Sequence, residues 1–117
     1  MSREVILEYA KRKYDTAPDY PWAKLSKYAV LRHKHHNKWY GLLMNVDRNK
    51  LSMEGDGEIE ILNVKCDPEL ATILRKEHGI LPAYHMNKEH WISIVLNGSV
   101  PNEEIFQLLD SSYELTK

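Results

Sequence analysis

Apolar and polar positions recur with two different periods, and the changes of period divide the chain into seven segments. Helical spacing in three of them and short β-branched or aromatic runs in the other four predict helices and strands. The predicted helices are residues 3–13, 67–78 and 101–115, and the predicted strands are residues 27–33, 38–46, 58–65 and 90–96. Short connections between consecutive strands favour antiparallel pairing. We therefore expect an α+β fold of order α-β-β-β-α-β-α, with a single antiparallel sheet and helices packed on one face.

Cap and turn residues support these boundaries. Ser2 is placed to cap the first helix, and Pro68 and Pro101 stand in the first turns of the other two, where a missing N–H costs nothing. Asn97-Gly98 is a strong turn signal before the last helix. Residues 80–86 are expected to cross over without regular structure.

The bulk composition indicates one globular domain, residues 1–117. Hydrophobic residues make up 43% of the chain and charged residues 28%, which is ordinary for a water-soluble protein. No apolar run approaches the ~20 residues that a membrane helix needs, and the first residues lack the apolar core of a signal peptide. Cys66 is the only cysteine, so no internal disulfide forms. We expect a cytoplasmic monomer with no membrane partner.

Charge is distributed unevenly along the chain. Residues 1–50 hold 11 Lys and Arg against 5 Asp and Glu, whereas residues 51–117 hold 5 against 12. The net charge of −1 therefore permits one basic and one acidic surface.

Three short motifs carry a family resemblance. They are Asn-Lys-Glu-His-Trp at 87–91, Asn-Gly-Ser-Val-Pro at 97–101 and Asp-Ser-Ser-Tyr at 110–113, and a Tyr-Pro-Trp run at 20–22 adds to them. The chain resembles the MmcQ/YjbR family over nearly its whole length. The resemblance implies a fold similar to that of frataxin and CyaY, with two prominent hairpins that have invited a double-wing DNA-binding label.

The first candidate site is the basic hairpin predicted between the first two strands. Lys and Arg can neutralise phosphates, and an aromatic side chain can stack on a base. We therefore expect a small, non-enzymatic protein that binds DNA through this hairpin. The nucleic-acid-binding candidates are Arg32, Lys34, His35, His36, Lys38 and Trp39. Because Trp39 and Tyr40 occupy alternating positions, at least one of them is expected to face the core.

The alternative is a small-molecule or protein-binding module centred on the corner at residues 87–91. Its candidate ligand-binding residues are His85, Asn87, Lys88, His90 and Trp91. A structural interpretation competes with this one, because Asn and His side chains can hold a sharp turn through the backbone. On that interpretation Trp91 is mostly buried, and Asn87 or His90 hydrogen-bonds the backbone within the corner.

Other chemistry has weaker support. The chain has no Gly-x-Ser-x-Gly elbow, no Walker A loop and no dinucleotide fingerprint, so we expect neither catalytic residues nor a cofactor. His33 and His35 lack a further fixed ligand for a metal, and Cys66 is expected to be a small buried hydrophobe. The acidic positions between residues 54 and 60 favour a solvated strand face over a metal site.

Overall fold

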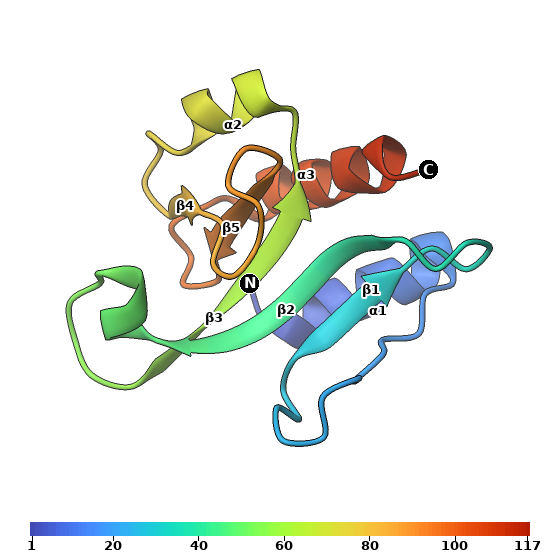
Figure 1. Ribbon diagram of the computed structural model, residues 1–117, viewed down its shortest axis with the longest axis horizontal. Coiled ribbons are helices and arrows are strands. Elements are labelled where there is room, and N and C mark those ends of the chain that lie inside the picture. The colour runs from blue at the N-terminus through green and yellow to red at the C-terminus, as the bar shows by residue number, and fades with distance from the viewer.

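The computed structural model describes residues 1–117 and contains three α-helices and five strands (Figure 1). None of the helices combines the length and apolar character needed to cross a membrane. The helices are α1 (Arg3–Tyr14), α2 (Pro68–Leu74) and α3 (Asn102–Leu115), and a short 3₁₀ helix, η1, spans Arg48–Leu51. The strands are β1 (Ala29–Arg32), β2 (Trp39–Asp47), β3 (Glu58–Lys65), β4 (Ile80–Pro82) and β5 (Trp91–Val95).

All five strands belong to one antiparallel sheet, in the order β1-β2-β3-β5-β4. The α+β class, the single antiparallel sheet and each predicted segment are confirmed, although α2 ends earlier than expected, at Leu74. The predicted order α-β-β-β-α-β-α is wrong in one respect, because it lacks β4. That strand has three residues and ends in Pro82, which lacks an N–H for the ladder. A strand so short shows no alternation in the sequence, and proline suits only a sheet edge.

The main core lies between the sheet and the helices. It is a cluster of 18 buried residues that draws on α1, α2 and α3, which confirms that the helices pack on one face. Ile6 of α1 and Leu109 of α3 meet Leu43 and Leu62 of the sheet there, and all four are fully buried. Figure 1 shows α1 and α3 behind the sheet. The opposite face of the sheet is therefore turned to the viewer.

Asp110 joins the first helix to the last. Its carboxylate accepts hydrogen bonds from the hydroxyls of Tyr9 (2.8 Å) and Tyr14 (2.5 Å) and from the Lys13 ammonium (2.8 Å). Burial alone would raise the pKa of Asp110, but the hydrogen bonds from Lys13, Tyr14 and Tyr9 outweigh it and lower that pKa. The aspartate of the 110–113 motif thus holds α3 against α1.

Ser112 occupies the point where β2 and β3 part. The ladder between these strands ends at the pair Gly41 and Val64. At the next position the Ser112 hydroxyl donates to the Tyr40 carbonyl (2.6 Å) and accepts from the Lys65 N–H (2.9 Å). One side chain of α3 therefore satisfies two strand backbone groups, and Figure 1 shows the two strands diverging.

Candidate functional site

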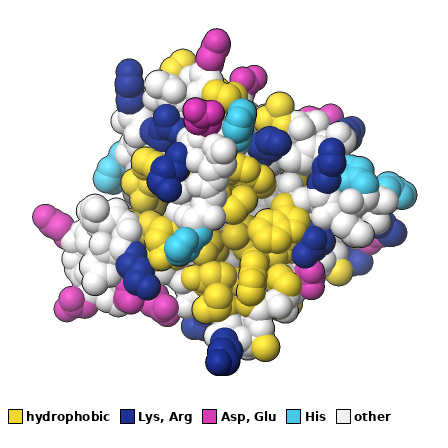
Figure 2. Space-filling view, viewed as in Figure 1, with side chains coloured by type: hydrophobic (Ala, Val, Ile, Leu, Met, Phe, Trp, Pro, Cys, Tyr) yellow, Lys and Arg dark blue, Asp and Glu magenta, His cyan; other side chains and the backbone are white.

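The sheet face opposite the α-helices carries a second apolar cluster, and we call it the open face. Loop and strand side chains border the cluster, and no α-helix covers it. Figure 2 shows hydrophobic side chains running across this face, with Lys and Arg side chains around them. The buried members are Val30, Leu42, Met44, Val46, Ile59, Ile61 and Val95.

A bulge in β2 sends Trp39 to the open face. Leu31 pairs with Gly41 and Arg32 pairs with Trp39, so Tyr40 is the extra residue. Tyr40 turns to the helix side, where it is fully buried, and burial raises its pKa to about 12. This confirms that at least one of the two aromatics faces the core. Trp39 remains half-buried, with the Arg32 guanidinium 5.4 Å from its ring centre.

An aromatic pocket of about 310 Å³ opens beside Trp39. The Trp22 ring stands nearly perpendicular to the rings of Tyr28 (80°) and Trp39 (87°), with ring centres 6.0 and 5.8 Å away. Of its eight lining residues only His85 is polar in character. The aromatic pocket is lined by Trp22, Leu25, Tyr28, Trp39, Leu42, Met44, His85 and Met86.

A buried polar network fixes one wall of the aromatic pocket. Asn63 and Ser93 are fully buried on β3 and β5 and hydrogen-bond one another. Ser93 accepts from the Tyr84 N–H (2.9 Å), and Asn63 donates to the Tyr84 carbonyl (3.0 Å). The loop that carries His85 and Met86 is therefore tied to the sheet through both backbone groups of Tyr84, and a fully satisfied buried network is rigid.

A second concavity, which we call the tryptophan groove, lies where β2 and β3 diverge. Its volume is about 310 Å³, and Trp39 separates it from the aromatic pocket because this side chain lines both. Lys65 pairs with Trp91 in neighbouring strands, so both project to the same side. The groove is lined by Lys38, Trp39, Lys65, Trp91, Leu115 and Thr116.

Two basic candidates of the hairpin are paired with acidic side chains. Arg32 contacts Asp19 at 3.0 Å, and Lys34 contacts Asp15 at 2.5 Å. Hydrogen bonds from Lys34 and Lys11 lower the pKa of Asp15 to about 2, so this carboxylate stays charged. The hairpin tip is therefore less basic than its sequence indicates.

The histidines of the hairpin differ in exposure. His35 and His36 are exposed, whereas His33 is buried and its Nε2 lies 2.7 Å from the Thr116 hydroxyl. The His36 ring lies 4.5 Å from the His33 ring, and its Nδ1 accepts the Lys38 N–H. The structure brings no three His, Cys, Asp or Glu side chains together in a metal-binding arrangement.

The corner at residues 87–91 is held by its own backbone. The Asn87 side-chain oxygen accepts the Glu89 N–H (2.8 Å), and its carbonyl accepts the N–H groups of His90 (3.3 Å) and Trp91 (3.0 Å). The prediction that Asn87 or His90 bonds the backbone within the corner is confirmed, with Asn87 as the residue. Asn87 therefore has a structural role.

The side chains of this corner do not converge on one site. Trp91 lines the tryptophan groove, His85 lines the aromatic pocket, and Lys88 lies at a third concavity. His90 is exposed, 4.0 Å from the Glu89 carboxylate. The prediction that Trp91 is mostly buried is confirmed, although the residue keeps some exposure at the first position of β5, where β2 no longer covers β3.

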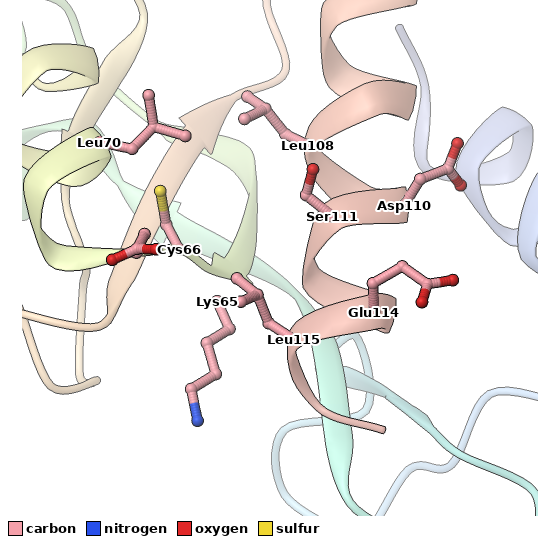
Figure 3. A pocket seen from close by; sticks show the side chains of 9 residues that line it. Lys65, Cys66, Leu70, Leu108, Asp110, Ser111, Glu114 and Leu115 are labelled. Atoms are coloured by element: carbon pink, nitrogen blue, oxygen red, sulfur yellow. The ribbon is translucent and has the colours of Figure 1, made fainter.

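A groove of about 420 Å³ separates α2 from α3 on another side of the molecule. Figure 3 shows Leu70, Leu108 and Leu115 around it, with Cys66 at its floor. The apolar spacing of α2 predicts a buried stripe at Leu70, Ile73 and Leu74, but only Leu74 is buried, and Leu70 and Ile73 are 42% and 61% exposed. Cys66 is buried as expected, and burial raises the pKa of its thiol, which keeps it in the unreactive protonated form.

Sequence reasoning missed two residues of the open face. Trp22 stands out in the sequence only as part of the Tyr-Pro-Trp run, and Lys65 only as the last residue of a predicted strand. The pairing of Lys65 with Trp91 depends on the register between β3 and β5, which are separated in the chain by α2 and β4. One signal could have indicated the face of Lys65. Polar Asn63 and Lys65 alternate in β3 with apolar Leu62 and Val64, so Lys65 points to the sheet face opposite these two apolar residues.

The YjbR family model matches residues 11–115, so it spans almost every element described above. The chain is 55% identical over 117 residues to the uncharacterised protein YyaQ of Bacillus subtilis (strain 168), covering 100% of this chain and 99% of that protein. It is 36% identical over 81 residues to the uncharacterised protein YjbR of Escherichia coli (strain K12), covering 68% of this chain and 69% of that protein. The chain belongs to the YjbR family.

A solved structure agrees with this assignment. The crystal structure of a Pseudomonas syringae protein is 48% identical and superposes with a TM-score of 0.98, covering 100% of both chains. A YjbR-like domain therefore accounts for the fold.

Proposed function

We propose that this protein binds DNA at the tryptophan groove. The observation that carries the proposal is the convergence of the two candidate sites: Lys38 and Trp39 from the hairpin line the same groove as Trp91 from the corner. Lys65 adds a second cation to the groove. Ammonium groups neutralise phosphates and indole rings stack on bases, so one concavity offers both interactions that a nucleic-acid strand uses.

The charges favour the groove over the hairpin tip. Lys38 and Lys65 form no ion pair, whereas Arg32 and Lys34 are already paired with Asp19 and Asp15. Displacing a paired carboxylate offsets part of the gain from a phosphate contact. Lys38 and Lys65 are therefore the expected phosphate contacts, with Arg32 as a weaker third.

The double-wing label is part of this proposal in a modified form. The two hairpin connections, residues 33–38 and 48–57, stand at opposite ends of β2. A strand of nine residues spans about 30 Å, and residues 48–57 carry two basic and two acidic side chains. Since the second connection is neutral, DNA contact is expected near the first hairpin, at its base.

The kinship to frataxin and CyaY and a cytoplasmic location are also part of the proposal. An antiparallel sheet with α1 and α3 on one face supports the kinship. The single buried free cysteine supports a reducing compartment. The alternative of a small-molecule or protein module at residues 87–91 has less support, because Asn87 closes the turn and His85, Lys88 and Trp91 line different concavities.

Fluorescence anisotropy of labelled oligonucleotides tests the proposal. With two free lysines, binding should be modest, about 10⁻⁴–10⁻⁶ M at physiological salt, and should weaken with a log–log salt slope of about −0.7 to −0.9 per phosphate neutralised. Lys38→Glu and Lys65→Glu should each weaken binding and flatten that slope.

Lys76→Glu is the matched control, because Lys76 is exposed in the turn after α2, lines neither concavity and forms no ion pair. It makes the same change of charge. Binding that is absent at low salt, or that falls equally in Lys76→Glu and the groove variants, contradicts the proposal.

A further inference from the structure

We infer that the aromatic pocket takes a single unpaired base, so that the preferred ligand is single-stranded DNA. This inference rests on the proposed function. The pocket and the tryptophan groove share the Trp39 side chain, so a strand whose phosphates meet Lys38 and Lys65 passes directly beside the pocket.

The ring geometry suits a flat guest. The Trp22 ring is nearly perpendicular to the rings of Tyr28 and Trp39. A ligand in the pocket can therefore contact the face of one ring and the edge of the next. Aromatic rings prefer offset stacking and edge-to-face contact. A base inside the pocket makes both kinds of contact at once, with the sulfur-containing side chains of Met44 and Met86 against its edge.

The size of the aromatic pocket and the charges beside it limit which ligands it can hold. A volume of about 310 Å³ lies at the lower end of the range for ligand pockets, roughly 300–1,000 Å³, and so fits a small ring system better than a folded partner. A cationic guest is disfavoured because Arg32 already occupies a cation–π position on Trp39 and Lys38 lines the adjoining groove. A neutral base suits the apolar and aromatic lining of the pocket, and the anionic backbone attached to it suits the cations Arg32 and Lys38 beside the pocket.

The pocket is built before any ligand arrives. Asn63 and Ser93 hold both backbone groups of Tyr84, and the next residue, His85, keeps a left-handed backbone with φ of 59°. A preformed pocket avoids much of the entropy cost of binding. The lining residue His85 carries an imidazole, which can hydrogen-bond a base edge.

A base that is paired in a duplex cannot enter, because its edge and both faces are already used. Entry therefore requires a single strand or a base taken out of the stack. The expected preference is for single-stranded over duplex DNA of the same sequence.

The test compares three probes of about ten nucleotides: an oligothymidylate, an abasic strand with the same phosphates, and a duplex. Wild-type protein should bind the oligothymidylate at least about fivefold more tightly than the abasic strand, since stacking of one base is worth ~1–3 kcal/mol. In Trp22→Ala that difference should shrink to what stacking on Trp39 and Trp91 of the groove supplies, while the dependence on Lys38 and on salt remains.

A second measurement on the wild-type chain keeps the inference testable should Trp22→Ala fold poorly. The Met44 and Met86 methyl signals should shift on addition of oligothymidylate, through the ring current of the base, and should not shift with the abasic strand. Equal affinity for the two strands, methyl signals that do not move at saturation, or a duplex that moves them equally overturns the base pocket. Failure of all three probes to bind overturns the proposed function instead.

Discussion

Replacing Ser112 by Ala should destabilise the fold far more than replacing its neighbour Ser111 by Ala. The Ser112 side chain is fully buried and its hydroxyl serves the Tyr40 carbonyl and the Lys65 N–H. Ser111 is exposed and its hydroxyl makes no hydrogen bond. The two substitutions remove the same atom from adjacent positions of the same helix, so differences in helix propensity cancel.

The magnitude follows from the two backbone groups that lose their partner. Each buried polar group left unsatisfied costs about 1–3 kcal/mol, and the Lys65 N–H lies where the strands part and is only part-buried. We therefore expect Ser112→Ala to lower the free energy of unfolding by roughly 2–4 kcal/mol relative to Ser111→Ala. That is a large share of the ~5–15 kcal/mol typical of a domain.

Urea denaturation followed by circular dichroism measures this difference. The midpoint of Ser112→Ala should move to lower urea with an unchanged slope, because the surface exposed on unfolding is the same. A difference from Ser111→Ala below about 0.5 kcal/mol, within the range of ordinary surface substitutions, would refute the bridging role of the hydroxyl.

Two further predictions concern the other polar contacts of the helix layer. Asp110→Asn should cost about 2–3 kcal/mol, since hydrogen bonds to a charged group are worth ~1.5–3 kcal/mol, and thermal unfolding of Asp110→Asn beside the exposed control Glu114→Gln checks this. Burial, and after it the charge of His36, lowers the pKa of His33 in the folded protein. As the pH falls, His33 is therefore protonated in the unfolded chain before it is protonated in the folded one. Stability should therefore fall as the pH drops below about 6.5, the ordinary pKa of histidine, towards the lower folded value. His33→Phe should flatten unfolding midpoints measured across that range, and an unchanged pH dependence would count against this role of His33.

The sequence predicted most of the fold because local patterns encode it. The caps and apolar stripes of α1 and α3 and the β-branched runs of the longer strands lie within single segments, where periodicity is visible. The sequence did not predict β4, because three residues ending in Pro82 show no period, and α2 ends at Leu74, four residues before its predicted end.

The candidate site was only partly predictable because it depends on register and on ion pairs. The hairpin was recognised as basic, yet its pairing with Asp15 and Asp19 joins segments that the sequence keeps apart. The bulge at Tyr40 determines the sheet face on which the Trp39 side chain lies, and no pattern in the neighbouring sequence predicts this bulge. Trp91 sits in an apolar run and is mostly buried as predicted, but its place at the first position of β5 also brings it to the groove, which the run does not show.

The measurement that tests DNA binding at the tryptophan groove most directly is a titration of the ¹⁵N-labelled protein with a short oligonucleotide, observed through its indole N–H signals. The chain has three tryptophans, and Trp39 and Trp91 line the groove. Both of their signals should shift together as the oligonucleotide is added, and added salt should reverse the shift. Shifts confined to the hairpin tip at residues 34–36, or to the α2–α3 groove, with the Trp39 and Trp91 signals unmoved, would contradict the assignment of the groove.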